Sequence, residues 1–222
     1  MPDSPDSMAE APVPGAPAPD PRFLEPLDAH SLDQLFREAH TTRRWADRPV
    51  PDVILAQAYD LAKMAPTSGN SQPLRILFVR SAEAKARLKP CLSPGNVEQT
   101  MAAPVTAIFA MDLEFYEHLP RLYPAEDARS WFAGKPEAIQ GNAELGSALQ
   151  AGYFILAARA LGLACGPMGG FGRHKTDETF FLGTDWGKTW RSRFLCNIGY
   201  PGAGGARPRD PRFRFDEACR VE

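Results

Sequence analysis

The chain has 222 residues, of which 25 are Lys or Arg and 27 are Asp or Glu, so that its formal net charge at pH 7 is −2. This near-neutral balance gives no general attraction to nucleic acid or to an anionic membrane surface, and no run of residues is apolar enough to span a bilayer. Four dispersed cysteines and an acidic, proline-rich start favour neither a zinc site, a disulfide framework nor a signal peptide, so we expect a soluble cytoplasmic protein.

The first 26 residues are rich in Pro, Ala, Asp and Ser, a composition that cannot bury enough apolar surface to fold. We predict a disordered tail over residues 1–26 and one domain over residues 27–222. Ser31 is the predicted N-cap of a first amphipathic helix, which the polar segment 40–45 ends.

Helices and strands are then predicted in alternation along the chain. Residues 51–64 form an amphipathic helix, residues 76–79 a buried strand, and residues 82–88 a charged helix. Strands follow at 104–110 and 194–200, separated by a helix over 142–162. The helix is apolar on nearly every face between residues 151 and 158, so it must be covered all round, by the sheet on one side and by a second subunit on the other. These elements predict an α/β or α+β domain.

Several common sites are excluded by their missing motifs. No Gly-x-Gly-x-x-Gly follows the first strand, and there is no Gly-x-Ser-x-Gly, His-Glu-x-x-His or Walker loop. A Rossmann nucleotide site, a serine hydrolase and a zinc hydrolase therefore lose their usual support.

The segment 165–171, Cys-Gly-Pro-Met-Gly-Gly-Phe, has the composition of a backbone cradle for a flat ligand. Proline fixes φ and the paired glycines remove Cβ atoms, so the main chain can approach a planar surface. The alternative is a tight turn between a strand and a helix.

Three polar segments complete a possible flavin site. Segment 40–45 offers hydroxyl and guanidinium groups, segment 66–73 offers hydroxyls and amides between two prolines, and Arg207 and Arg209 place two cations on one extended face. Each has an ordinary alternative: a solvated helix end, an exposed Ser/Asn turn, and a basic tail without a partner.

These segments carry a family resemblance. The chain reads APTSGNSQP at 65–73, GN at 95–96, APVTA at 103–107, DARSWF at 127–132, GPMGGF at 166–171 and NIGY at 197–200. In order and spacing they resemble the FMN-dependent nitroreductase family, and the DARSWF run resembles its malonic semialdehyde reductase branch, which acts in pyrimidine degradation. The resemblance covers the chain from about Leu27 onward.

The resemblance implies an α+β fold with a central mixed sheet flanked by helices, and an intertwined homodimer with FMN at its interface. It implies that segment 40–45 contacts the phosphate and the pyrimidine edge of FMN and that the C-terminal arginines clamp the phosphate. It also implies that segment 66–70 reaches the flavin of the neighbouring subunit, and that segment 167–170 covers one flavin face, with the N–H of Gly169 aimed at N5. Many members have Arg-x-Ser where this chain has Ala39-His40-Thr41, which favours Thr41 over His40. The contacts that many relatives make after the Gly-Asn pair are not carried over to Gln99 and Thr100. The implied FMN contacts are His40, Thr41, Arg43, Pro66, Thr67, Ser68, Asn70, Pro167, Met168, Gly169, Gly170, Arg207 and Arg209.

The implied reaction is reduction of malonic semialdehyde to 3-hydroxypropionate with NADPH or NADH as co-substrate. A small carboxylate substrate needs a cation, and Arg129 is our hypothesis for it, with Arg121 as second choice, because both lie in an insert over residues 113–136. Both could instead be solvated charges. Two other functions remain open: a broad nitro or quinone reductase, and a flavin-binding protein without turnover.

Overall fold

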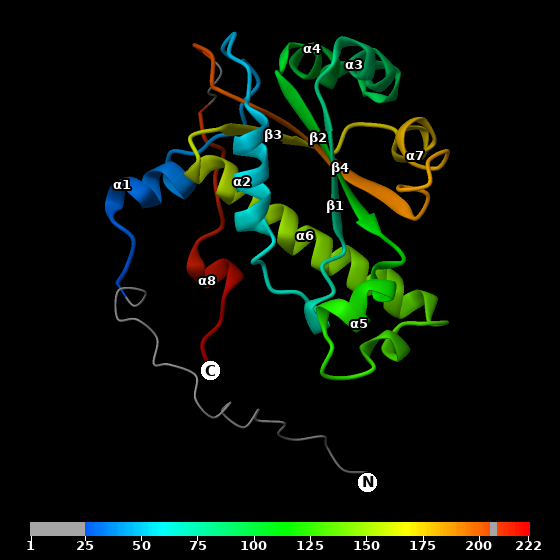
Figure 1. Ribbon diagram of the computed structural model, residues 1–222. Coiled ribbons are helices and arrows are strands. Elements are labelled where there is room, and N and C mark those ends of the chain that lie inside the picture. The colour runs from blue at the N-terminus through cyan, green and yellow to red at the C-terminus, as the bar shows by residue number, and fades with distance from the viewer. Residues whose placement is uncertain (1–24, 205–207) are drawn as a thin grey trace.

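A computed structural model describes residues 25–204 and 208–222 (Figure 1). Apart from Glu25 and Pro26, the predicted disordered tail lies outside the described residues. The strands are β1 (Leu74–Val79), β2 (Val105–Asp112), β3 (Ala164–Met168) and β4 (Trp190–Gly199). The α-helices are α1 (Ala29–Leu32), α2 (Asp52–Ala62), α3 (Ala82–Leu88), α4 (Pro94–Ala102), α5 (Leu119–Leu122), α6 (Pro136–Ala160), α7 (Arg173–Phe180) and α8 (Phe215–Ala218). Short 3₁₀ or π turns are η2 (Asp33–Arg37), η3 (Ser68–Asn70), η4 (Lys89–Cys91), η5 (Phe115–His118) and η6 (Ala128–Trp131).

The four strands form one sheet in the order β1-β2-β4-β3, and each neighbouring pair is antiparallel. The predicted α+β class is therefore confirmed, but the named strands do not make the mixed sheet that we expected. Parallel pairing comes from an isolated bridge between Thr41 and Cys165, which adds the 40–45 segment to the β3 edge.

Apolar residues on both faces of β2 explain why helices cover the sheet on both sides. Val105 and Phe109 pack with α2 and α6, whereas Ile108 and Ala110 pack with α3 and α7. Successive side chains in a strand point to opposite faces, so a continuous apolar run requires two layers of cover. Figure 1 shows α3, α4 and α7 at the upper right, away from α2 and α6.

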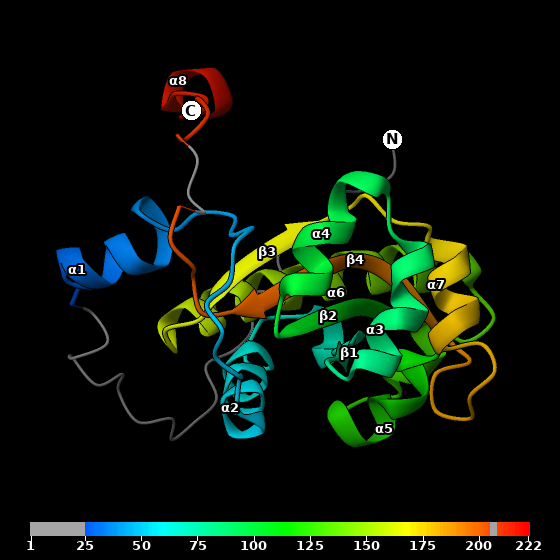
Figure 2. The same ribbon diagram turned by 90° about the horizontal axis from the view of Figure 1, so that it is seen from above.

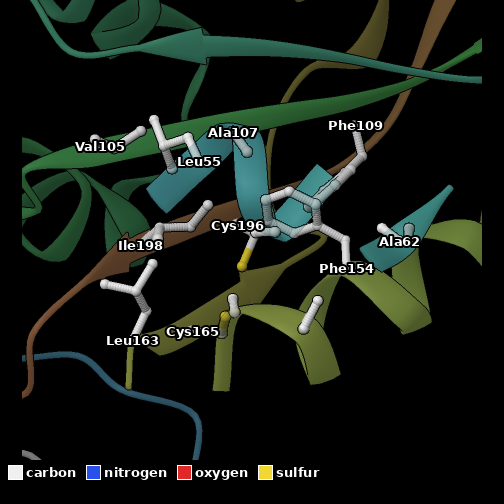
Figure 3. Packing of buried hydrophobic residues seen from close by; sticks show 14 of the residues in the cluster. Leu55, Ala62, Val105, Ala107, Phe109, Phe154, Leu163, Cys165, Cys196 and Ile198 are labelled. Atoms are coloured by element: carbon white, nitrogen blue, oxygen red, sulfur yellow. The ribbon is translucent and has the colours of Figure 1, made fainter. Parts of the chain in front are cut away.

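The larger core lies between the sheet and α6 (Figure 3). The ring of Phe154 on α6 meets that of Phe109 on β2 at a centroid distance of 5.3 Å and an interplanar angle of 70°. Both side chains are fully buried, and burial of one large apolar side chain contributes about 1.5–3 kcal/mol. This contact fixes α6 against the centre of the sheet.

Most predicted helix positions are confirmed, but one predicted N-cap is wrong. The charged helix at 82–88 matches α3, whose cap Ser81 accepts a hydrogen bond from the N–H of Ala84 at 3.1 Å. The first helix begins at Ala29 instead, because the carboxylate of Asp28 accepts from the N–H of Ser31 at 2.7 Å. Ser31 therefore lies inside the first turn.

The glycine-rich segment begins as a strand, because Ala164–Met168 forms β3. Pro167 is tolerated there because β3 is an edge strand, where a missing N–H leaves no ladder bond unmade. The predicted cradle is thus shorter than the motif and begins at Gly169.

Helix α4, which the sequence did not predict, is held by a buried lysine. The Nζ atom of Lys85 donates to the carbonyl oxygens of Thr100, at 2.9 Å, and of Ala103, at the C-terminal end of α4. Burial lowers the pKa of Lys85. A cation is favourable at a helix C-terminus, where carbonyl groups lack helical partners.

Candidate functional site

The 40–45 segment is fastened to the sheet by main-chain hydrogen bonds. The N–H of Thr42 donates to the carbonyl of Cys165 at 2.9 Å, and that of Ala46 donates to the carbonyl of Tyr200 at 2.9 Å. A Cβ atom on Gly166 would lie 2.5 Å from the carbonyl oxygen of Thr42. Only glycine permits this approach, so the structure brings His40 and Thr41 beside β3.

His40 and Thr41 line an open cavity of about 820 Å³ between the first helical turns, β3 and the segment after β4. The guanidinium of Arg209 donates to the carbonyls of Arg37 at 2.6 Å and of Ala39, a residue that lines the cavity, at 2.9 Å. His30 and Arg159 also line the cavity, as do the carboxylates of Asp33 and Glu38. The structure therefore places Arg209 next to the segment that carries His40 and Thr41, while Arg207 lies outside the described residues. That these side chains bind a phosphate stays a prediction.

Arg43 points into a different cavity. It lines a space of about 600 Å³ with Trp45 and the α4 residues Gly95 and Gln99. Gly202 lines both cavities, so the two spaces adjoin. The structure thus separates Arg43 from His40 and Thr41, because consecutive parts of the 40–45 segment line two different cavities.

The cradle that follows β3 offers free main-chain donors. Within residues 25–204 and 208–222, the N–H groups of Gly169 and Gly170 donate no hydrogen bond. A Cβ atom on Gly169 would meet no atom within 4 Å, so its main chain faces open space. Unpaired N–H groups beside open space suit a flat ligand with acceptor atoms.

A polar network on α4 supports the cradle from behind. Asn96 donates to the carbonyl of Gly170 at 2.8 Å, Gln99 donates to Asn96 at 2.7 Å, and the indole of Trp45 donates to the carbonyl of Gln99 at 3.1 Å. Asn96 and Gln99 were not among the predicted site residues, although the Gly-Asn pair at 95–96 was one of the motifs noted. That pair was the available signal.

Strands β3 and β4 carry a buried pair of cysteines (Figure 3). Cys165 on β3 and Cys196 on β4 are both fully enclosed. A hydrogen bond with the Cys165 thiol, together with burial, raises the pKa of Cys196 well above its usual value. Such a thiol is a packing group and a poor nucleophile.

The 66–70 loop and His40 line different cavities. Pro66, Thr67 and Ser68 line a cavity of about 230 Å³ with the first half of α6, and Asn70 donates to the carbonyl of Leu122 in α5 at 2.8 Å. Figure 1 shows this loop, which joins α2 to β1, beside α5 and away from β3. A single chain therefore does not bring the 66–70 loop together with the 40–45 segment and the cradle.

The insert over residues 113–136 has its own small core, in which Phe115 meets Phe132 at 5.0 Å between ring centroids. Arg129 forms a bidentate ion pair with Glu117, at 2.8 and 2.7 Å. The hydrogen bond with Arg129 lowers the pKa of Glu117. The proposed substrate cation is thus already partnered by a carboxylate.

Arg121, the second choice, is differently placed. It is exposed and has no ion pair or side-chain hydrogen bond within the described part of the chain. It lines a cavity of about 460 Å³ together with His118, Gln72 and Arg75, next to the 66–73 loop. Its charge is free to meet an anion.

The residues present fit a flat cofactor that carries an anionic group. Open space and free N–H groups at Gly169 can receive its flat part, and the polar and cationic groups near Thr41, which pairs with Cys165 of the same strand, can receive an anion. In the described residues, no group of three or more His, Cys, Asp or Glu side chains could hold a metal ion, and no helix has the length and apolar character needed to cross a membrane.

Comparisons with known proteins identify the family and the fold of the chain. The profile of the nitroreductase family matches residues 36–200. A candidate NADH dehydrogenase/NAD(P)H nitroreductase of Burkholderia lata is 55% identical over 88% of this chain and 98% of that protein, and one of Stutzerimonas stutzeri is 53% identical over 87% and 97%. A candidate nitroreductase of Exiguobacterium sibiricum, solved in complex with FMN, superposes with a TM-score of 0.74 at 20% identity, over 85% of this chain and 96% of that one. One of Bacillus subtilis gives a TM-score of 0.77 at 18% identity, over 88% and 100%.

Proposed function

The chain belongs to the nitroreductase family, and from this premise we propose that it is an FMN-dependent oxidoreductase that reduces malonic semialdehyde to 3-hydroxypropionate with NADPH or NADH. The observation that carries the cofactor is the cradle at Gly169, where free N–H groups face open space. The substrate is a finer proposal, supported by the two arginines of the insert over residues 113–136 and by its DARSWF motif.

When bound, FMN would supply the chemistry of hydride transfer from NAD(P)H to the aldehyde carbon, and water would supply the proton that the aldehyde oxygen takes up. The residues of the chain supply position and charge. The N–H groups of Gly169 and Gly170 would hold the flat ring, and Thr41, His40 and Arg209 would hold the phosphate. In this proposal Arg43, Pro167 and Met168 contact the same cofactor, and segment 66–70 reaches it from a second subunit.

We propose that the carboxylate of the substrate is held by an arginine of the insert. Arg129 would first have to release Glu117, with which it makes two short hydrogen bonds. Arg121 needs no such release, and its cavity adjoins the 66–73 loop. This difference favours Arg121 as the group that binds the carboxylate, and both arginines are tested below.

An anaerobic experiment tests the function. The purified protein should be yellow, NADPH should bleach it, and malonic semialdehyde should restore the colour faster than a neutral quinone does. A preference for the quinone would instead support a broad nitro or quinone reductase, and a protein that takes up no FMN would contradict the whole proposal.

The Arg121→Leu variant should raise KM for malonic semialdehyde about tenfold or more, because a hydrogen bond to a charged group contributes about 1.5–3 kcal/mol. KM for a neutral quinone should stay unchanged. Steady-state kinetics of Arg121→Leu and Arg129→Leu with both substrates decide which arginine acts. Equal effects on aldehyde and quinone would contradict a carboxylate-binding role for either.

We also propose a homodimer. Apolar side chains are exposed on α2 and α6, and Figure 2 shows α8 standing away from the sheet, with Phe213 83% exposed and Phe215 68% exposed. The exposed apolar residues of the two helices are Val53, Tyr59, Leu61, Leu145, Leu149 and Tyr153, and Met64 is exposed just after α2. A second copy covering them would complete the cover expected for α6 and could bring a 66–70 loop to the cradle.

Sedimentation velocity should give twice the chain mass of 24.3 kDa. The double variant Leu145→Glu, Leu149→Glu should sediment as a monomer, because charges in a buried apolar interface are unfavourable. Gln140→Glu, at an exposed position on the same helix, is the matched control and should remain dimeric. A wild-type monomer at micromolar concentration would refute this proposal.

A further inference from the structure

The 67–72 loop has an unusual backbone. Gly69, Asn70 and Gln72 have φ angles of 56°, 48° and 42°, which are left-handed values. Side chains with a Cβ rarely adopt this conformation, so Asn70 and Gln72 hold it only if surrounding contacts enforce it. The loop must therefore be fixed by groups that can be identified.

Part of the support is internal to the loop. The N–H of Gln72 donates to the hydroxyl of Thr67 at 3.2 Å, and the amide of Gln72 donates to the Oδ1 atom of Asn70 at 2.8 Å. A further bond at 2.8 Å joins the hydroxyl of Ser71 to Asn142 of α6. These contacts fix the shape of the loop on its α6 side.

The other side of the loop is held by the insert. The Nδ2 atom of Asn70 donates to the carbonyl of Leu122 at 2.8 Å, a contact between residues 52 apart in sequence. A Cβ atom on Gly69 would lie 3.1 Å from the Cζ3 atom of Trp131, so the indole edge packs directly on the Gly69 backbone. Trp131 is 39% exposed, which is not the burial of a core residue.

Contacts within the insert fix the position of Trp131 against the 67–72 loop. The ring of Trp131 lies 5.7 Å from that of Tyr123 and 6.5 Å from that of Phe132. The Arg129–Glu117 ion pair joins η6 to η5, and Phe132 packs in the small core of the insert. Trp131 is therefore held in place by the insert.

We propose that Trp131 is a positioning residue, which together with the carbonyl of Leu122 holds the 67–72 loop in the left-handed conformation that meets the flavin. This inference rests on the proposed function, in which that loop reaches the cofactor. It connects the loop that contacts the flavin to the insert that carries Arg121 and Arg129, the arginines proposed to bind the substrate. A change at Trp131 should therefore alter cofactor binding without a direct contact to the cofactor.

Hydrogen exchange of the FMN-free protein measures the loop directly. In Trp131→Ala, the amides of residues 67–72 should exchange about tenfold faster or more, while those of β2 keep their wild-type rates. Trp131→Phe should restore most of the protection, because a ring still covers Gly69. Trp186→Ala is the matched control, since Trp186 is 52% exposed and packs instead on Phe181 and Trp190.

FMN titration measures the consequence. If the competent loop population falls to about a tenth, the apparent Kd for FMN should rise about tenfold in Trp131→Ala, with recovery in Trp131→Phe. Asn70→Gly, which permits the left-handed φ but loses the bond to Leu122, should weaken FMN binding less than Asn70→Ala, which loses both.

Wild-type exchange in Trp131→Ala would overturn the inference. So would faster exchange with an unchanged Kd for FMN, because the loop would then have no positioning role. A wild-type protein that binds no FMN would defeat the proposed function and, with it, the positioning role, while normal exchange in Trp131→Ala would defeat the inference alone.

Discussion

Replacing Gly166 by Ala is expected to destabilise the protein and to release its cofactor together. The new Cβ would lie 2.5 Å from the carbonyl oxygen of Thr42, 3.4 Å from the ring of Trp45 and 3.5 Å from the Cβ of Asn197. The nearest of these is main chain, which cannot turn aside as a side chain can. Overpacking of this kind costs about 1–3 kcal/mol, and we expect the upper part of that range.

The loss of cofactor follows from the hydrogen bonds at the same place. Moving Thr42 away from β3 stretches its bond to Cys165, which holds Thr41 and His40 beside the strand. Urea unfolding should show the lower free energy of unfolding, and FMN titration a weaker Kd.

Gly141→Ala is the matched control for this change. Gly141 lies inside α6 and a Cβ there would meet no atom within 4 Å. Alanine in a helix interior is favoured over glycine by about 0.5–1 kcal/mol, so this variant should be slightly more stable than the wild type. Equal stability of the two variants would contradict the close-packing argument for Gly166.

Replacing Gly169 by Val should have the opposite signature, with cofactor lost and stability kept. A Cβ on Gly169 meets nothing within 4 Å, and its φ is not in the left-handed region, so the variant should fold normally. The added branched side chain would fill the space through which a flat ring approaches the main-chain N–H. The variant should purify colourless, with Kd for FMN raised at least about a hundredfold and stability within about 0.5 kcal/mol.

Gly183→Val tests whether any exposed glycine would behave in this way. Gly183 is exposed with the same open surroundings, in the loop after α7, and its variant should remain yellow. If Gly169→Val keeps its colour and wild-type affinity, the flat ligand does not lie on this cradle. The two glycines thus differ in role: Gly166 is needed for close packing against Thr42, and Gly169 is needed for access of the flat ligand to the main chain.

Local patterns predicted most of the elements. The charged helix at 82–88 and the helix near 51–64 follow from caps and apolar spacing, which depend on residues within a few positions of one another. The prediction of Ser31 as the first cap was wrong, because Asp28 also belongs to a residue type that caps well and the surrounding chain selects it. Pro167 concealed a strand, since its tolerance depends on the position of β3 at the sheet edge.

The candidate site was predicted in pieces. The cradle and the 40–45 segment were both proposed from the sequence, and the structure joins the 40–45 segment to β3, the strand that leads into the cradle, through the bridge between Thr41 and Cys165. That they form one site stays a prediction. Asn96 and Gln99 were missed as supports because their role depends on α4 packing against the carbonyl of Gly170. The Glu117 partner of Arg129 was missed for the same reason, since the ion pair is made only when η5 and η6 pack together.

The sequence by itself determined the alternation of elements, the apolar core positions and the motifs that point to the family, because periodicity, caps and glycine placement are local properties of the chain. The tertiary structure decided which charges are already paired, which glycines are close-packed and which face open space. Those properties depend on contacts between residues far apart in sequence, such as Asn70 with Leu122 or Gly166 with Thr42, which no local pattern encodes.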